Sequence, residues 1–497
     1  MDSKLVVLAH REPYEEQATD DGPRLVLKTN GVFRTLDAVL RERAGTWIAW
    51  RARDADAWHP RVEAPAGEDG SSYQIRRIPL TPAEADRFYY DFTSTALWPV
   101  LFSMLDRARF TRAAWETYRR VNQQFADAVC EEAADGAIVW INDFHLMLVP
   151  RLLRDRRPDL TLALFLHTAF PPPDTFGIIP WREELMDGLL HLDIASFHIP
   201  SYALNFANTA ERFMGARARE FVSVDVRENR PAIAVSRYPR ALVFGDHEVR
   251  LSVHAVGVDT ARLTELASAP RTVEDARRIH RELGCRQMIL SAERLDYVKG
   301  FQERLECFER YLERHPDRRG DVAFVQIGVP TRSGMDEFQE MRRRTEEAVG
   351  RINGRFGTLE WAPVHFFYTS FPLDELVAFY RAAAVAWVTP LRDGLNLVAK
   401  EYVASRVDED GVLVLSEFAG AAAELDGAVL TNPYSPDDMD QALAKALDMP
   451  EAERGERMRQ LRRRVQAFDV HRWARSFLSD AQDLAAHRHA PSEPSVV

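Results

Sequence analysis

Carboxylates and a glycine that could bind a ligand lie where an apolar run of the sequence is followed by a predicted helix. In TPLRDGLNLVAKEYVAS, residues 389–405, a polar loop follows the run AVAWV and precedes a helical pattern. A glycine before a helix lets a ligand approach the backbone, and the first N–H groups of a helix attract anions. Residues 394–396 therefore suit an anion. Asp393 could accept hydrogen bonds from sugar hydroxyls. Glu401 lies about two turns along the helix and could accept hydrogen bonds from ribose hydroxyls. A strand, a turn and a capped helix with solvent-facing charges would explain the same residues.

Two cations follow another apolar run at the same kind of boundary. In SAERLDYVKGF, residues 291–301, Arg294 and Lys299 stand on either side of a predicted turn. A planar guanidinium and a compact ammonium together suit a diphosphate, and they would stabilise negative charge that develops on it. These residues alone favour a plainer interpretation, a basic surface pair with Glu293 and Asp296 as its partners.

His167 and Asp143 end two further apolar runs. His167 closes LALFLH and could bond a sugar hydroxyl or polarise the bond that breaks, although a satisfied core histidine fits as well. Asp143 follows AIVWIN and could bind sugar hydroxyls or orient an acceptor. Because a helical pattern comes next, Asp143 could instead cap a helix.

A third set of residues suits a phosphomonoester. Arg11 follows the first apolar run, Arg332 follows FVQIGVPT, and DRFYYDFTSTALWPV supplies Tyr89 and Trp98. Guanidinium groups and a tyrosine hydroxyl bind phosphate oxygens well. Aromatic residues at helical spacing are more often core, so Tyr89 and Trp98 prove little by themselves.

Parallel strands would bring these scattered residues together. Short apolar runs read as strands buried on both faces: KLVVLA, AIVWIN, LTLALFLH, IASFHI, RLSVHAVGV, QMILSAERL, VAFVQIGV, VHFFYT, AVAWVTP and GVLVLS. Helical patterns, such as those over residues 110–133 and 336–356, lie between them. This alternation indicates an α/β fold with doubly wound parallel sheets, in which ligands bind beyond the carboxyl ends of the strands.

The bulk properties of the chain limit its class. A length of 497 residues predicts two large domains, with a break near 255–275. A net charge of −12 does not favour a nucleic-acid partner. Cys130, Cys285 and Cys307 lie in no metal or redox cluster, which predicts reduced thiols in the cytoplasm.

Several sequence signals of other protein classes are missing. The N-terminus reads as a strand instead of a signal peptide, and no apolar run is long enough to predict a membrane span. The sequence contains no P-loop, no Gly-x-Gly-x-x-Gly after a strand, no His-Glu-x-x-His, no zinc cluster and no Gly-x-Ser-x-Gly. These absences count against NTPases, dehydrogenases, zinc hydrolases and α/β-hydrolases.

Several longer strings, taken together, resemble the retaining glycosyltransferases of the trehalose-6-phosphate synthase superfamily, glycosyltransferase family 20. They span residues 140 to 430 in order: NDFHLMLVPRLLR, LFLHTAFPPPDTFGIIPWREELMDGLL, ERLDYVKGF, VPTR, AVGRINGRFGTLEWAPVHFFY, TPLRDGLNLVAKEYVA and LSEFAGAAAEL. A series of this length is highly specific.

A narrower resemblance is to the glucosylglycerol-phosphate synthase branch. The strings that carry it are HREPYEE, TNGVFRTL, GTWIAW, SYQIRRIPLTPAE, SFHIPSYALNFAN, VHAVGVD and LTNPY. Trehalose-6-phosphate synthases usually have an Asn-Arg-Leu-Pro type start and a Gly-Gly-Leu loop, whereas this chain has His-Arg-Glu-Pro at 10–13 and Asn-Gly-Val at 30–32. Both departures lie where the acceptor is expected, and they count against glucose 6-phosphate.

The resemblance implies a GT-B fold with two Rossmann-like domains that face a cleft. Residues 1–255 would hold the acceptor and residues 256–480 the nucleotide sugar, with the last helix crossing back to the first domain. Residues 481–497 are expected to form a flexible tail.

The resemblance also implies roles for individual residues. Catalysis would involve Asp143, His167, Arg294, Lys299 and Asp393. The donor would contact Arg294, Lys299, Asp393, Gly394, Leu395, Asn396, Leu397, Val398 and Glu401. The acceptor would contact Arg11, Tyr89, Trp98, Asp143 and Arg332. No protein metal site is expected.

The reaction implied by the branch joins ADP-glucose to sn-glycerol 3-phosphate and supplies the precursor of glucosylglycerol, a compatible solute. No tightly bound cofactor is expected, and Mg²⁺ would at most stimulate the reaction. The partners would be small molecules, and neither a nucleic acid nor a membrane is expected. A homo-oligomer is possible. The alternatives are a trehalose-6-phosphate synthase that uses UDP- or GDP-glucose and glucose 6-phosphate, a pseudo-glycosyltransferase, which the intact donor motif disfavours, and a non-catalytic sugar-phosphate sensor.

Overall fold

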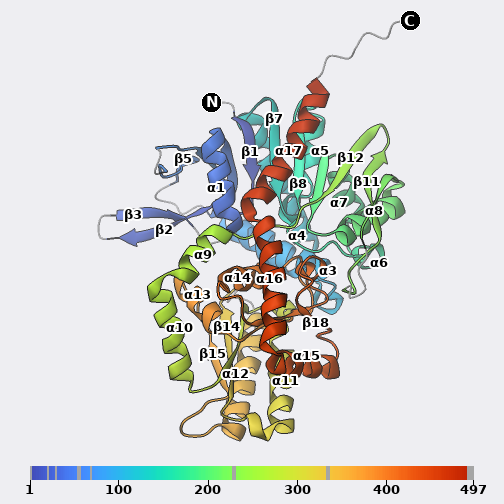
Figure 1. Cartoon of the computed structure of the whole chain (residues 1–497). Helices are drawn as coiled ribbons and strands as arrows, with labels where there is room; N and C mark the ends of the chain where they lie inside the picture. The colour runs from blue at the N-terminus through green and yellow to red at the C-terminus, as the bar shows by residue number, and fades with distance from the viewer. Residues whose placement is uncertain are drawn as a thin grey trace, which may run out of the picture. The chain divides into compact units, whose positions relative to one another are not determined.

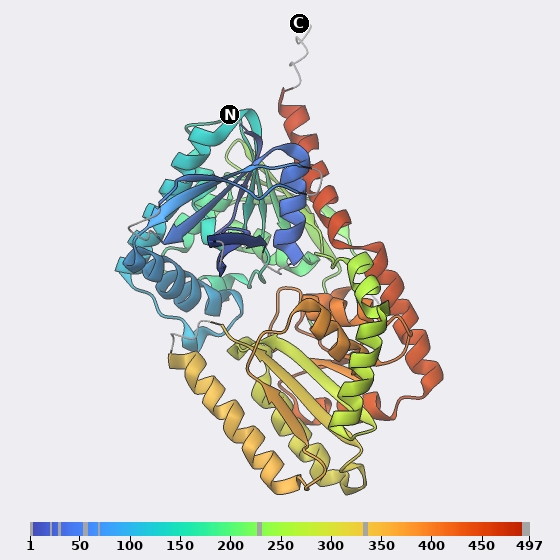
Figure 2. The ribbon, with the colours of Figure 1, turned by 90° about the vertical axis from the view of Figure 1, so that its left-hand side faces the viewer.

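The structure is a computed structural model that describes residues 3–19, 22–27, 31–52, 58–67, 70–225, 231–331 and 336–489. It divides into two compact units. Unit 1 comprises Met1–Val226, Val235–Ala255 and His471–Val497, and unit 2 comprises Arg227–Ala234 and Val256–Val470. Figures 1 and 2 show the chain from two directions.

Unit 1 is built on a mixed sheet of ten strands in the order β10-β11-β12-β9-β8-β7-β1-β4-β6-β5. The strands are β1 (Ser3–Leu8), β4 (Thr46–Ala52), β5 (Arg61–Glu63), β6 (Gln74–Leu80), β7 (Ala133–Asn142), β8 (Thr161–Phe165), β9 (Ile194–Phe197), β10 (Arg217–Ser223), β11 (Arg237–Phe244) and β12 (His247–Val253). From β12 to β6 all neighbours are parallel, and β5, β10 and β11 add antiparallel edges. A separate hairpin pairs β2 (Tyr14–Thr19) with β3 (Gly22–Leu27).

The helices of unit 1 range from single turns to long amphipathic segments. They are α1 (Gly31–Arg43), α2 (Pro82–Ala85), a π-helix over Asp86–Leu97, α3 (Trp98–Leu101), α4 (Arg112–Glu132), α5 (Val149–Arg154), α6 (Pro173–Phe176), α7 (Arg182–Leu189), α8 (Pro200–Met214) and α17 (Val470–His489). Short 3₁₀ turns cover Leu105–Arg107 and Phe144–Leu146.

Helix α17, in red in Figure 1, brings the end of the chain back to unit 1. Trp473 lies 5.6 Å from Trp140 of β7 and 5.0 Å from Phe165 of β8, ring centre to ring centre, and Phe477 packs on the same two rings. The helix continues to His489, so residues 481–489 of the predicted tail are helical. Residues 490–497 lie outside the described residues.

Unit 2 is a fully parallel sheet of six strands in the order β15-β14-β13-β16-β17-β18. The strands are β13 (Gln287–Arg294), β14 (Val322–Val329), β15 (Val364–Phe367), β16 (Val385–Val388), β17 (Val412–Ser416) and β18 (Val429–Thr431). The helices are α9 (Thr260–Ser268), α10 (Pro270–Leu283), α11 (Phe301–Arg314), α12 (Asp336–Phe356), α13 (Leu373–Ala382), α14 (Leu397–Ser405), α15 (Pro436–Asp448) and α16 (Glu451–Ala467), with 3₁₀ turns over Tyr297–Lys299, Pro316–Arg318 and Gly420–Ala423.

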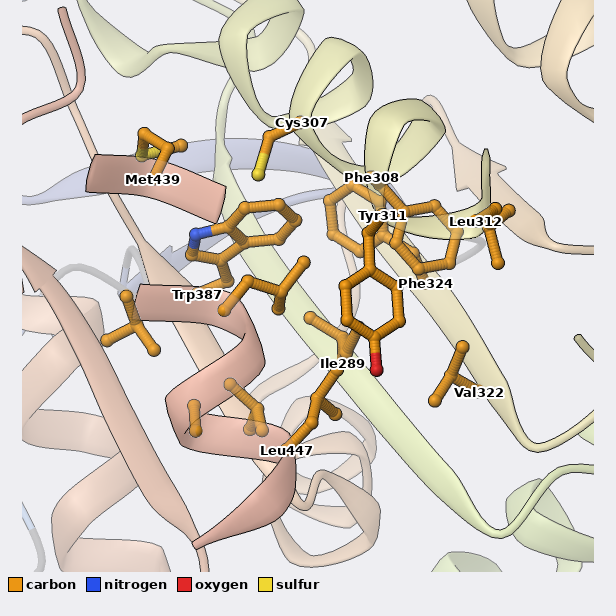
Figure 3. Packing of buried hydrophobic residues seen from close by; sticks show 14 of the residues in the cluster. Ile289, Cys307, Phe308, Tyr311, Leu312, Val322, Phe324, Trp387, Met439 and Leu447 are labelled. Atoms are coloured by element: carbon orange, nitrogen blue, oxygen red, sulfur yellow. The ribbon is translucent and has the colours of Figure 1, made fainter. Parts of the chain in front are cut away.

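Helices cover both faces of the unit 2 sheet, as expected for strands without polar alternation. Helices α11, α12 and α15 pack together on one face, and α9, α10, α13 and α14 on the other. Figure 3 shows the core under α11 and α15, where Trp387 of β16 and Phe324 of β14 meet Phe308 of α11. Each such ring contributes about 1.5–3 kcal/mol when fully buried, so the core holds β13 and β16 in the positions from which their polar extensions start.

Candidate active site

The loop between β16 and α14 is held closely against a second loop that follows β17. Asp393 N donates to the carbonyl of Phe418, and Gly420 N donates to the carbonyl of Asp393. A Cβ at Gly420 would lie 2.1 Å from the carbonyl oxygen of Gly394, so only glycine fits there. Asn396 has a φ of 81° and caps α14 by accepting from Ala399 N. The helix therefore starts with N–H groups that it cannot satisfy itself, in a fixed position.

A buried network of charges joins this loop to the end of β13. Lys299 Nζ donates to Asp393 Oδ2 and lies 3.9 Å from Glu293 Oε1. Asn396 Nδ2 donates to both carboxylates, at 2.9 Å to Glu293 Oε1 and 3.0 Å to Asp393 Oδ2. Arg304 Nη2 forms an ion pair with Glu293 Oε2 at 3.1 Å, and both side chains are fully buried. Two cations and two carboxylates thus meet at the carboxyl ends of β13 and β16.

Burial sets the pKa directions in this network. Burial raises the pKa of Glu293, with Arg304 and Lys299 acting in the opposite direction. Burial lowers the pKa of the Arg304 guanidinium, which Glu293 counteracts. Arg304 also donates to the Lys299 carbonyl at 2.7 Å, so Glu293 and Arg304 fix the turn that carries Lys299.

Arg294 and Lys299 lie in different environments. Arg294 ends β13 with an exposed side chain, whereas Lys299 ends a 3₁₀ turn and is mostly buried. Asp296, expected as a surface partner of these cations, caps the 3₁₀ turn through the Val298 N–H instead. Lys299 is therefore not half of an exposed basic surface pair.

Glu401 and Lys400 point to different partners from the same helix. Tyr380 donates to Glu401 Oε2 at 2.9 Å, and burial raises the pKa of the Glu401 carboxyl. Lys400 is buried, forms an ion pair with Glu424 at 2.5 Å and donates to the carbonyl of Val256. Lys400 thus anchors α14. Leu397 and Val398 of the same helix are partly buried.

In unit 1, Asp143 and His167 meet at the ends of β7 and β8. Asp143 has a φ of 70°, its N–H donates to the carbonyl of Phe165, and its Oδ1 accepts from His167 N at 3.1 Å. The Asp143 side chain does not cap the 3₁₀ turn that follows, so the helix-cap interpretation is wrong. His167 Nε2 lies 3.4 Å from Asn142 Oδ1, and burial lowers the pKa of His167 to about 3. The imidazole is therefore neutral near pH 7.

The predicted acceptor residues lie in unit 1 with one exception. The Arg11 guanidinium lies 4.6 Å from the centre of the Tyr89 ring. Trp98 is only 7% exposed and packs on Phe102 and Phe144, ring centres 4.3 and 6.1 Å away. Arg332 lies outside the described residues. Arg11 and Tyr89 are thus brought together, and Trp98 belongs largely to an aromatic core.

In the described part of the chain, no group of three or more His, Cys, Asp or Glu side chains is placed to hold a metal ion. None of its helices combines the length and the apolar character needed to cross a membrane.

Nearly the whole chain matches one protein family. The model of glycosyltransferase family 20 covers residues 3–483, so the chain belongs to that family and is a glycosyltransferase. The predicted family and enzyme class are thereby confirmed. The family and its named relatives also support the prediction of a retaining glucosyltransferase.

Named relatives fall into two groups. The chain is 38% identical to the glucosylglycerol-phosphate synthase of Picosynechococcus sp., over 99% of this chain and 100% of that one. It is 41% identical to the trehalose-6-phosphate synthase of Mycobacterium sp. (strain JLS), over 97% of each chain. The crystal structure of an α,α-trehalose-phosphate synthase (UDP-forming) from Burkholderia vietnamiensis matches with a TM-score of 0.84 at 33% identity, covering 98% of this chain and 99% of that one. The predicted α/β GT-B fold with two Rossmann-like units is confirmed.

Proposed function

We propose that this enzyme transfers glucose from ADP-glucose to sn-glycerol 3-phosphate, with retention, to give 2-O-(α-D-glucosyl)-sn-glycerol 3-phosphate and ADP. The observation that carries the proposal is the buried network of Lys299, Asp393, Asn396 and Glu293 at the strand ends of unit 2. It joins the two motifs that the family resemblance assigns to the donor. The similarity to glucosylglycerol-phosphate synthases favours the acceptor.

In the proposed mechanism, unit 2 stabilises the departing nucleotide diphosphate. Arg294 is exposed at the end of β13 and would pair with the phosphates as charge develops. Lys299 is held by Asp393, and an ammonium with three donors can bond a phosphate while it keeps the carboxylate. Asp393 and the start of α14 would hold the glucose, and Glu401 the ribose.

Proton transfer in this mechanism does not need a side chain. A leaving phosphate oxygen on the face where the acceptor enters can take the proton of the attacking hydroxyl. His167 is neutral near pH 7 because burial lowers its pKa to about 3, so it would bond a sugar hydroxyl without donating a full proton. The protein then contributes positioning and charge stabilisation.

The acceptor phosphate would be held in unit 1 by Arg11 and Tyr89. The guanidinium fork and phenol hydroxyl are the donor types that a phosphomonoester prefers. Asp143, fixed by its bond from the His167 N–H, would accept from a hydroxyl of either sugar or acceptor. Arg332 and Trp98 stay predicted members of this set.

The direct test is product analysis. Purified enzyme is incubated with ADP-, UDP- or GDP-glucose against glycerol 3-phosphate or glucose 6-phosphate, followed by mass spectrometry. ADP release with glucosylglycerol phosphate is expected. Trehalose 6-phosphate as main product would instead establish the second candidate, which the 41% identity to a trehalose-6-phosphate synthase favours. Absence of any nucleotide release would point to a sensor.

The expected cofactor requirement can be measured in the same assay. The enzyme is proposed to act in the cytoplasm, in synthesis of a compatible solute, with small-molecule partners only. It is proposed to need no tightly bound cofactor, with Mg²⁺ at most stimulatory. Activity that is retained after EDTA treatment and gel filtration would support this, and activity abolished by EDTA and restored by Mg²⁺ would contradict it.

A further inference from the structure

The strand ends of unit 1 carry a stack of planar groups that the motif assignments leave unexplained. The rings of His10 and His145 lie 3.9 Å apart, centre to centre, with only 9° between their planes. The Tyr89 ring is parallel to both, 5.7 Å from His10 and 6.2 Å from His145. These three distances form a triangle, so each ring contacts the other two, and Tyr89 lies beside the pair of histidines. The Arg11 guanidinium lies over Tyr89. We call these four side chains the His10 cluster.

The His145 side of this cluster is fixed by the fold. His145 is 4% exposed, and its neighbour Phe144 packs against it with ring centres 4.2 Å apart. The turn that carries both is tied to α4, because Tyr118 donates to the Phe144 carbonyl and Asn122 donates to the His145 carbonyl. His145 therefore forms a rigid base on which the His10 ring rests.

The backbone beside Arg11 is fixed from the opposite side. Trp47 Nε1 donates to the Arg11 carbonyl at 3.1 Å. Glu12 accepts from Arg77 Nε at 2.7 Å and from Arg77 Nη2 at 3.0 Å, and both side chains are buried. A bidentate pair of this kind fixes the relative orientation of the two side chains as well as the distance between them. The main chain at residues 10–12 thus has little freedom, and the orientation of the Arg11 and Tyr89 side chains is set by what they contact.

Tyr89 reaches the His10 cluster from an unusual backbone. It lies in the π-helix Asp86–Leu97, whose wide turns are rare and occur often at functional sites. Tyr89 and His10 are partly exposed, so this side of the cluster is accessible. His10 rests on the buried His145 ring and lies beside the partly exposed Tyr89 ring.

We propose that His10 is a positioning residue for the phosphorylated acceptor. Its ring rests on the rigid His145 ring and packs beside Tyr89, and so holds the Tyr89 hydroxyl and the Arg11 guanidinium in one phosphate-binding arrangement. This inference rests on the proposed function only in placing the acceptor phosphate at Arg11 and Tyr89. It concerns the ring of His10, not its nitrogen atoms.

The proposal predicts a split between two substitutions at one position. His10→Asn removes the ring and keeps a polar side chain, so the KM of the phosphorylated acceptor should rise about tenfold, the order of one lost stacking contact. The KM of the nucleotide sugar should stay within about twofold by the same measure. His10→Phe keeps a planar ring and should retain the acceptor KM within about twofold. His59→Asn, at an exposed histidine of the same unit, serves as the matched control.

The experiment measures initial rates with whichever phosphorylated acceptor the wild-type enzyme uses, so a different wild-type product would overturn the proposed function without deciding the role of His10. An unchanged acceptor KM in His10→Asn overturns the inference. An equal rise in His10→Asn and His10→Phe also overturns it, because the nitrogen atoms would then matter instead of the ring. If thermal denaturation shows that His10→Asn does not fold, His10→Gln takes its place in the same comparison.

Discussion

The two strand-end regions hold their side chains by different means. In unit 2, Glu293, Arg304, Lys299 and Asp393 are joined by ion pairs in a buried setting. In unit 1, His10, Tyr89 and His145 are joined by ring contacts, and their supports are neutral hydrogen bonds and one buried ion pair beneath. A charge network binds strongly but leaves a costly unpaired charge when one member is removed. When one ring is removed from a group of packed rings, only contact area is lost, so the structural effect should stay local.

Among substitutions in the two regions, the largest expected effect is on the stability of unit 2. Glu293→Ala would leave Arg304 buried without its carboxylate, and loss of one partner of a buried pair costs about 3–5 kcal/mol. The urea midpoint of the variant should fall accordingly. Glu453→Ala, which removes an exposed partner of Arg457, should have a much smaller effect. Similar midpoints for the two variants would show that the buried pair is not a stabilising element.

A second large effect is expected on turnover. Arg294→Ala should lower kcat by about 10²–10³-fold, as for loss of one key charge stabiliser, while the protein stays folded because the side chain is exposed. Arg286→Ala, at the other end of the same strand region, is the control and should turn over normally. Near-normal turnover of Arg294→Ala would remove Arg294 from the diphosphate site.

A smaller effect should appear on the acceptor side. Arg11→Ala should raise the KM of the phosphorylated acceptor by about 10–100-fold, the range for a hydrogen bond to a charged group. The KM of the nucleotide sugar should not change, since Arg11 belongs to unit 1. Steady-state kinetics with each substrate varied in turn test this prediction. An equal rise in both KM values would contradict the binding of the acceptor phosphate by Arg11.

The smallest effect concerns pH. The folded pKa of His167, about 3, lies below the unfolded value, which is ~6.5. Below the unfolded pKa the unfolded chain therefore binds the proton that the folded chain refuses, and stability is lost as the pH falls towards 3. Between pH 7 and 5 this amounts to about 2 kcal/mol, and His167→Gln should lack that part. Urea midpoints at both pH values test this, with His59→Gln as control; equal losses in all three proteins would exclude a buried neutral imidazole.

The sequence was most informative about the central strands. QMILSAERL and AVAWVTP correspond to β13 and β16, and the helical pattern over 336–356 coincides with α12. Strands buried on both faces are continuous apolar runs, which can be recognised from the sequence alone. Strands β10 and β11 were not predicted, because RAREFVS and RYPRALVF mix exposed charges with apolar residues at the antiparallel edge of a sheet.

The candidate site shows the same limit. Motifs pointed to Lys299 and Asp393, which the structure brings into contact. They did not point to Arg304, which lies in a helix body and meets Glu293 only through the fold. The His10 cluster was equally hidden, since its members come from three distant segments. For Trp98 the motif match predicted an acceptor contact, whereas the structure mainly shows burial among aromatic side chains.

The return of α17 to unit 1 has a consequence for how the chain matures. Unit 2 is synthesised in full before unit 1 is, because Trp473 and Phe477 follow its last residue, Val470. Until they emerge, the apolar side chains around Trp140 and Phe165 stay exposed to water, and the sheet of unit 1 lacks part of its cover. A nonsense mutation near residue 470 would therefore damage a sheet whose strands are translated well before that codon.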